Sequence, residues 1–227
     1  MSSIQHKFIE FCIESNVLRF GEFKTKAGRL SPYFFNAGLF NTGAMLSKLA
    51  DFYARTLIKA MEDGRIECDM IFGPAYKGIT LAAAVAMRMA ELGYDLPFAY
   101  NRKEVKDHGE GGSMVGYKPQ AGDRVVIVED VVTAGTAVRE TIELFKSVAA
   151  VDLTALIVSV DRMERGTGDK TTLDELREDY GIQVFPIVTV REVIDFLHNN
   201  PVDGKVYIDD EMKAKMEAYL EQYGAKG

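Results

Sequence analysis

Short runs of consecutive apolar residues alternate along this chain with longer segments in which apolar residues recur at helical spacing. The runs that predict strands are 69–72, 97–100, 124–128, 154–160 and 183–188. The segments that predict helices begin near residues 4, 42, 78, 136, 172 and 209, and the last five end near residues 62, 92, 148, 180 and 223. Strands that are apolar throughout and alternate with helices are typical of a parallel sheet covered on both faces. The predicted fold class is therefore α/β.

The same pattern bears on domain organisation. Residues 21–36, between the first two predicted helices, are expected to be irregular. No repeat, low-complexity run or Pro/Gly/Ser-rich linker divides the 227 residues. A chain of this length normally forms one domain, so we expect a single domain over residues 1–227.

Composition and charge narrow the classes of function. Apolar residues make up 47% of the chain and charged residues 27%, a balance that excludes disorder, collagen and coiled coil. With a formal net charge of −7, the protein lacks the positive electrostatic field of a general nucleic-acid binder. No nucleic-acid partner is therefore expected. The two cysteines, Cys12 and Cys68, are too few for a disulfide framework and do not have zinc-site spacing.

No segment predicts attachment to a membrane. The most apolar stretch, residues 79–87, is far shorter than the roughly 20 residues of a membrane span. Glu10 and Glu14 are not expected in a signal peptide. Together with the cysteine usage, these features predict a cytoplasmic protein with no membrane partner, either an enzyme or a small-molecule binder.

The densest candidate chemistry follows the apolar run 125–128. Glu129 and Asp130 come directly after it, and the small or hydroxyl-bearing residues 133–137 open the next predicted helix. Ligands of parallel sheets bind at the carboxyl ends of strands, and 133–137 offers the N–H groups of a phosphate cradle. The carboxylates suit sugar hydroxyls or a Mg²⁺ ion bound to them. The alternative is an ordinary helix N-cap beside two acids placed by chance.

Four cationic or titratable side chains lie close together in this otherwise acidic chain: Arg102, Lys103, Lys106 and His108. Glycines follow at once, so the segment suits a lid that closes over a polyanion and excludes water. His108 would donate a proton to a leaving group near neutral pH, or Lys106 would act through its charge alone. The residues leave both roles open, and a solvated charged loop is the alternative.

Three further groups are weaker candidates. Lys77 lies in the segment 73–78 after a predicted strand, where it is placed to reach a phosphate. Phe34 and Phe35 point in opposite directions if the chain is extended, so one ring is available as a wall against a flat heterocycle. The alternative for this pair is one core ring and one partly exposed ring. Arg162 follows another apolar strand, and its planar guanidinium matches a carboxylate. Taken alone, a lysine or arginine at these places carries little weight.

Four segments together carry a family resemblance. Residues 125–136, VVIVEDVVTAGT, resemble the motif with which type I phosphoribosyltransferases bind phosphoribosyl diphosphate (PRPP). Residues 24–36, 73–78 and 102–111 resemble the orotate segment, the diphosphate loop and the mobile catalytic loop of orotate phosphoribosyltransferases. The segments occur in the family's order and cover most of the chain, with no departure at the functional positions.

This resemblance implies a type I phosphoribosyltransferase fold, a mostly parallel central sheet flanked by helices, with about the first 40 residues forming a hood over the active site. It implies transfer of ribose 5-phosphate from PRPP to N1 of orotate, giving orotidine 5′-phosphate and diphosphate in de novo pyrimidine synthesis. It also implies a homodimer with shared active sites, Mg²⁺ held mainly through PRPP and water, and a non-proline cis peptide between Ala75 and Tyr76.

Residue by residue, the resemblance assigns three sets of side chains. The catalytic set is Lys103, Lys106, His108 and Asp130. The PRPP-binding set is Lys26, Tyr76, Lys77, Arg102, Lys103, Lys106, His108, Glu129, Asp130, Val131, Val132, Thr133, Ala134, Gly135, Thr136 and Ala137. The orotate-binding set is Phe34, Phe35, Thr133 and Arg162.

Two rival functions stay open. One is a phosphoribosyltransferase that uses a purine base or uracil, against which the Phe34–Phe35 pair and the lysine-rich segment both argue. The other is a PRPP-sensing regulator that has lost catalysis. Such a regulator would carry an added basic DNA-binding module, and the sequence shows none.

Overall fold

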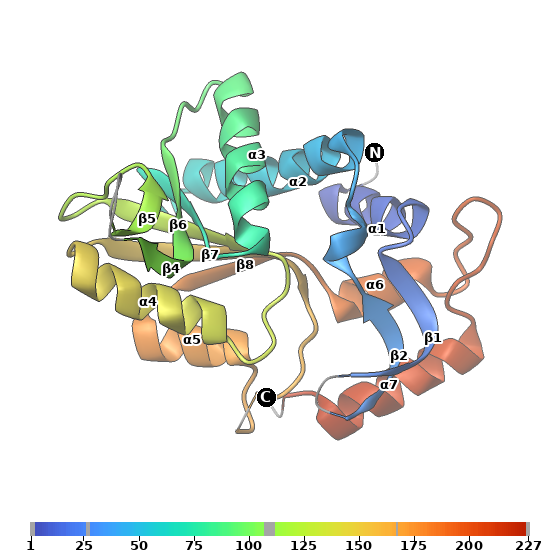
Figure 1. Ribbon diagram of the computed structural model, residues 1–227. Helices are drawn as coiled ribbons and strands as arrows, with labels where there is room; N and C mark the ends of the chain where they lie inside the picture. Colours follow the sequence, from blue (N-terminus) through green and yellow to red (C-terminus); the bar gives the residue numbers. More distant parts are fainter. Residues whose placement is uncertain (1–2, 26–27, 107–111, 167, 226–227) are drawn as a thin grey trace.

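The computed structural model describes residues 3–25, 28–106, 112–166 and 168–225 (Figure 1). The helices are α1 (Ile4–Glu14), α2 (Gly43–Glu62), α3 (Lys77–Glu91), α4 (Thr136–Val148), α5 (Thr172–Tyr180), α6 (Val190–Leu197) and α7 (Asp210–Tyr223), with a short 3-10 helix, η1 (Ala37–Leu39). The strands are β1 (Leu18–Lys24), β2 (Leu30–Phe35), β3 (Met70–Gly73), β4 (Phe98–Lys106), β5 (Gly112–Gly116), β6 (Arg124–Glu129), β7 (Asp152–Asp161) and β8 (Gln183–Thr189).

A six-stranded sheet forms the centre of the molecule, with the strand order β5-β4-β3-β6-β7-β8. All neighbouring strands are parallel except the edge strand β5, which is antiparallel to β4. The chain adds strands on one side of β3 and then, from β6, on the other side. In open α/β sheets, ligands bind at the carboxyl ends of the two strands where this reversal occurs, here β3 and β6. The predicted α/β class and mostly parallel sheet are confirmed.

Helices cover both faces of this sheet because the central strands are apolar on both faces. Val126 and Val128 of β6 pack in the core cluster that includes α2 and α3, whereas Ile127 packs against α4 and α5. Figure 1 shows the same division, with α2 and α3 on one side of the sheet and α4 and α5 on the other. Burying one strand from two sides is what the continuous apolar run at 125–128 predicts. Residues 125–129 of β6 are thereby buried, up to the last residue of the strand.

The expectation that residues 21–36 are irregular is wrong. Strands β1 and β2 form an antiparallel hairpin there, with Leu18 opposite Phe35 and a register shift between Phe20 and Phe23. Tyr33 and Phe35 point into the core while Phe34 lies on the other side of the strand. The short strands, the bulge and Pro32 break up the period-two signal that would have revealed them.

Strand β5, helix α6 and the short η1 also lie outside the predicted pattern. Strand β5 contains glycines at both ends, which hide a strand signal, and it extends the sheet by pairing with β4. Helix α6 follows β8 directly and begins with a capping box, in which Thr189 and Glu192 each bond the other's backbone N–H. The hairpin β1–β2 packs on α7, beside α1 and α6 (Figure 1). No helix in the described ranges is long and apolar enough to cross a membrane.

Candidate functional site

The two adjacent carboxylates lie at the carboxyl end of β6. Glu129 is the last residue of the strand and is only 9% exposed. Burial, and next the charge of neighbouring Asp130, raise the pKa of Glu129 to about 8. The backbone N–H of Asp130 donates to Glu129 Oε1 at 3.1 Å, which helps to orient the buried carboxyl group. The pair therefore combines a carboxyl that holds a proton near neutral pH with a more accessible carboxylate.

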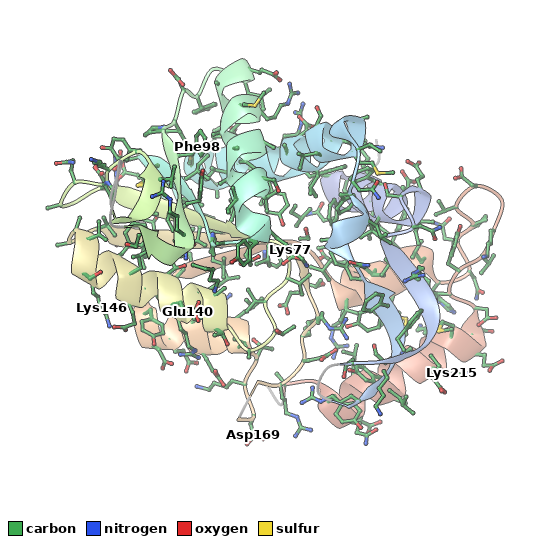
Figure 2. All side chains as sticks on the ribbon, viewed as in Figure 1. Lys77, Phe98, Glu140, Lys146, Asp169 and Lys215 are labelled. Atoms are coloured by element: carbon green, nitrogen blue, oxygen red, sulfur yellow. The ribbon has the colours of Figure 1, made fainter. Side chains whose placement is uncertain are left out.

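Lys77 joins this acidic pair from a different strand end. Its Nζ lies 2.5 Å from Asp130 Oδ2, although the two residues are 53 positions apart in the sequence. Lys77 is the first residue of α3, and Figure 2 shows it in the middle of the molecule, at the end of that helix which meets the sheet. The sequence placed Lys77 after one strand and Asp130 after another, and the structure brings them into direct contact.

The turn that carries Lys77 is unusually tight. A Cβ atom on Gly73 would overlap the carbonyl group of Gly78, so the strand end and the helix start touch through bare backbone. The peptide bond between Ala75 and Tyr76 is cis, which confirms the prediction from the resemblance. The Ala75 N–H donates to Asn101 Oδ1 at 2.7 Å, and the Tyr76 side chain is left largely exposed.

Asn101 is a residue that the sequence interpretation missed. It lies in β4, immediately before the cationic segment, and its side chain holds the neighbouring β3–α3 turn. An asparagine within a strand was the only available signal, since asparagine is depleted in strands and needs a partner for its amide.

Residues 131–137 link β6 to α4 and present an open helix N-terminus. No side chain caps α4 among the described residues, and Thr133, Ala134 and Thr136 are exposed. Gly135 has φ +71°, and a Cβ there would lie 2.8 Å from Thr172 Cγ2. The Thr172 hydroxyl donates to the Thr133 carbonyl at 2.7 Å and holds the loop from behind. Free N–H groups at the start of a helix favour an anion.

The cationic segment differs from the expected loop. Arg102 and Lys103 belong to β4, which continues through the backbone of Lys106, and Lys103 Nζ lies 3.0 Å from Glu140 Oε2 of α4. The segment therefore starts as a strand, because β5 folds back and pairs with it. Lys26, His108 and the side chain of Lys106 lie outside the described residues, so their predicted roles stay predictions.

Phe34 and Phe35 separate as their alternation requires. Phe35 is buried in the core next to Phe40, with ring centroids 6.5 Å apart. Phe34 is half-buried and stacks on Phe23 at 5.5 Å, with the Arg19 guanidinium 5.7 Å from its ring. This arrangement is the alternative of one core ring and one partly exposed ring. Of the two, only Phe34 is left to form a wall against a ligand.

Arg162 follows β7, next to the hairpin. Its Nε and Nη2 atoms donate to Glu164 Oε1 at 2.9 and 2.5 Å, and its guanidinium lies 4.4 Å from the centre of the Tyr33 ring. Glu164 also accepts from the Tyr219 hydroxyl at 3.0 Å and pairs with Arg29 at 3.4 Å. Two arginines around one carboxylate leave a net positive charge in this mostly buried cluster.

The capacity of the site for a metal is limited. Within the described part of the chain, no group of three or more His, Cys, Asp and Glu side chains is arranged to hold an ion. Glu129 and Asp130 therefore fit a divalent cation only where phosphate oxygens or water complete its ligands.

Comparison with known proteins decides the family. A family model described as "Phosphoribosyl transferase domain" matches residues 44–199. An orotate phosphoribosyltransferase of Clostridium acetobutylicum is 50% identical over 227 residues, covering all of both chains. One of Neisseria meningitidis is 50% identical over 226 residues, also at full coverage of both. This chain belongs to the orotate phosphoribosyltransferase family.

Solved structures agree with that assignment. The crystal structure of the orotate phosphoribosyltransferase of Francisella tularensis is 37% identical, with a TM-score of 0.82 over 96% of this chain and 100% of that one. The Mycobacterium tuberculosis enzyme in complex with PRPP shares the fold, with a TM-score of 0.58 over 84% of this chain and 13% identity. The predictions of a type I phosphoribosyltransferase fold, of this family and of an enzyme are confirmed. The regulator without catalysis receives no support.

Proposed function

We propose that this phosphoribosyltransferase transfers ribose 5-phosphate from PRPP to N1 of orotate, giving orotidine 5′-phosphate and diphosphate. The observation that carries the proposal is the 2.5 Å contact between Lys77 and Asp130. It joins a cation for phosphate to a carboxylate for a sugar, at the start of the loop that leads to the open N-terminus of α4. Full-length relatives in Clostridium acetobutylicum and Neisseria meningitidis that bear the name orotate phosphoribosyltransferase support the choice of base.

The 5′-phosphate of PRPP would bind at residues 131–137. Small exposed residues there leave the N–H groups accessible, and the helix dipole adds a favourable charge. Thr133 and Thr136 supply hydroxyl donors at the same place. Because Gly135 and Thr172 fix the loop, the cradle is formed before the substrate arrives.

The ribose hydroxyls would bind to Glu129 and Asp130. A protonated Glu129 both donates and accepts hydrogen bonds, and Asp130, held by Lys77, offers further acceptor oxygens. The two side chains can therefore orient two neighbouring hydroxyls in a defined direction. Mg²⁺, when bound, would neutralise diphosphate charge, with PRPP oxygens and water as its main ligands and these carboxyls beside it.

The diphosphate would contact Tyr76 and Lys77, together with the cationic residues of and after β4. As diphosphate departs from the anomeric carbon, positive charge develops on the sugar and negative charge on the leaving group. Lys77 and Lys103 stabilise the negative charge on the departing diphosphate, and His108 or Lys106 also stabilises it. No side chain forms a covalent bond, so positioning and electrostatics carry the rate.

Orotate would bind between the hairpin and the end of β7. Arg162 offers a guanidinium for its carboxylate, and the half-buried Phe34 offers a flat apolar face. The positive charge left by Arg29, Arg162 and Glu164 favours an anionic base over uracil or a neutral purine. The β1–β2 hairpin is the element that would act as the hood over this site.

The test is an absorbance assay with purified protein, orotate, PRPP and Mg²⁺, following loss of the orotate band. Loss of absorbance is expected with orotate, and none with chelator present. Parallel reactions contain uracil or hypoxanthine in place of orotate and are followed by product chromatography. Turnover of uracil or hypoxanthine but not orotate would contradict the proposal.

We also propose a homodimer in which the cationic segment that begins with Arg102 and Lys103 of β4 serves the partner's site. A mixture of Lys103→Ala and Asp130→Ala subunits should then regain activity, since one site in each heterodimer is intact. Each variant alone should stay inactive in the same assay. A mixture no more active than its components would argue against shared sites.

A further inference from the structure

Helix α2 contributes one polar group to the core beneath the acidic pair. Tyr53 is fully buried, and its hydroxyl lies 2.7 Å from the carbonyl oxygen of Glu129 and 2.7 Å from Ser159 Oγ. Ser159 lies near the end of β7 and is also fully buried. The side chains around this contact belong to the apolar cluster that joins α2 to the sheet.

Donor and acceptor chemistry fixes the direction of these bonds. A carbonyl oxygen only accepts, so the single proton of the Tyr53 hydroxyl goes to Glu129. The Ser159 hydroxyl must therefore donate to Tyr53. The result is a chain of bonds from Ser159 through Tyr53 to the backbone of Glu129, inside a core where an unpaired carbonyl is costly.

Ser159 holds the next residue as well. Its backbone N–H donates to the carbonyl oxygen of Asp130 at 2.9 Å. The carbonyls of Glu129 and Asp130 are thus both bonded from behind, one through Tyr53 and one through Ser159. Their side chains project from a backbone that is fixed at two successive peptide groups.

We propose that Tyr53, supported by Ser159, is a positioning residue that sets the orientation of the Glu129–Asp130 pair toward the ribose of PRPP. This inference rests on the proposed function, in which the pair binds the ribose hydroxyls. Hydrogen bonds to a ribose require donors and acceptors at defined angles, and small misplacements in an active site are expensive in rate. Tyr53 itself does not touch the substrate.

The central experiment is steady-state kinetics of Tyr53→Phe, which keeps the ring and removes the hydroxyl. KM for PRPP should rise about tenfold because the Glu129 carbonyl loses its partner and the acidic pair shifts. KM for orotate should stay within about twofold, since the hydrogen bonds of the hydroxyl go to Glu129 and Ser159 and not to Arg162 or Phe34. Ser159→Ala should raise KM for PRPP less, because Tyr53 keeps its bond to Glu129.

A matched control lies on the same two strands. The Thr154 hydroxyl lies 3.0 Å from the carbonyl oxygen of Glu67 and 3.3 Å from that of Val125, so its single proton can go to either, at the start of β7 and β6. Thr154→Val therefore removes a hydroxyl-to-carbonyl bond at the opposite ends of the same strands. It should lower stability with no change in KM for PRPP.

Three outcomes would overturn the inference: an unchanged KM for PRPP in Tyr53→Phe, an equal rise in Thr154→Val, or a parallel rise in both KM values. If Tyr53→Phe does not fold, Ser159→Ala is judged by the same criteria. PRPP titration calorimetry of wild type and Asp130→Asn separates the two proposals. If Asp130→Asn binds PRPP as wild type does, the ribose assignment fails; if Asp130→Asn alone is weakened and Tyr53→Phe is not, only the Tyr53 inference fails.

Discussion

Lys103 of β4 reaches across to Glu140 of α4, with 3.0 Å between Nζ and Oε2. The contact ties the strand that leads into the cationic segment to the helix whose N-terminus forms the proposed phosphate cradle. A lysine assigned to diphosphate is thus held by a carboxylate in the structure. Substrate binding has to compete with that ion pair.

Removing the competing carboxylate should therefore favour PRPP. We expect Glu140→Gln to lower KM for PRPP by about twofold to threefold, since ion pairs this exposed contribute little energy. Glu143→Gln is the control, because Glu143 forms its ion pair with Lys146 of the same helix. Steady-state kinetics at low salt measures both. A higher KM in Glu140→Gln would show that the pair positions Lys103 for binding.

The proton on Glu129 should appear in the pH dependence of stability. Burial raises its pKa from about 4.5 to about 8, so the folded protein keeps a proton that the unfolded chain loses. This contribution is fully present below about pH 4.5 and is lost as pH rises through about 8. The free energy of unfolding should fall across this window by on the order of 2–4 kcal/mol. Urea denaturation at a series of pH values measures it.

Glu129→Gln is the matched variant for that measurement. It keeps the shape and hydrogen-bonding groups of the protonated side chain but cannot ionise. The wild type should lose stability between pH 5 and pH 8 through ionisation of Glu129, and the variant should lack this loss. Equal slopes for the two proteins would mean that Glu129 is already ionised at neutral pH.

Gly135 should be intolerant of any side chain. Gly135→Ala imposes φ +71° on an L-residue and places Cβ 2.8 Å from Thr172 Cγ2. Gly181 has the same φ of +71° with no atom within 4 Å of an added Cβ, so Gly181→Ala measures the backbone strain alone. We expect about 1–2 kcal/mol of destabilisation for Gly181→Ala and a greater loss for Gly135→Ala. Only Gly135→Ala should also weaken PRPP binding by calorimetry.

Arg162 should govern orotate and not PRPP. Arg162→Lys keeps the charge but loses the planar fork that bonds Glu164. KM for orotate should rise about 10-fold to 100-fold while KM for PRPP changes little. Arg177→Lys on the exposed side of α5 serves as the control. A rise in KM for PRPP alone would contradict the assignment of Arg162 to orotate and would indicate that it binds PRPP.

The sequence predicted the parts of the molecule in which local pattern and tertiary environment agree. The run at 125–128 is apolar on both faces, so its strand, the acids after it and the helix at 136–148 were all recovered. The hairpin was missed because a bulge and a proline interrupt its alternation. The cis peptide at Ala75–Tyr76 was predicted only through the family resemblance.

Contacts between distant segments could not be read in the same way. Tyr53 looks like any core aromatic of an amphipathic helix, and only the folded sheet puts its hydroxyl at Glu129. Lys103 and Glu140 are 37 residues apart, and no local period relates them. Burial of Glu129 likewise depends on packing from several elements, so its raised pKa has no signature in the residues next to it.

The overlap between Gly73 and Gly78 has a consequence for how this enzyme tolerates mutation. A Cβ on Gly73 meets the backbone of Gly78, and a Cβ on Gly78 lies 2.7 Å from the carbonyl carbon of Gly73. Because the nearest atoms in both cases are main chain, trimming the neighbouring side chain of Ala82 or Pro74 does not remove the overlap. In a deep mutational scan, no substitution of Gly73 or Gly78 should give an active enzyme, either alone or together. The end of β3 and the start of α3 therefore cannot change independently of each other.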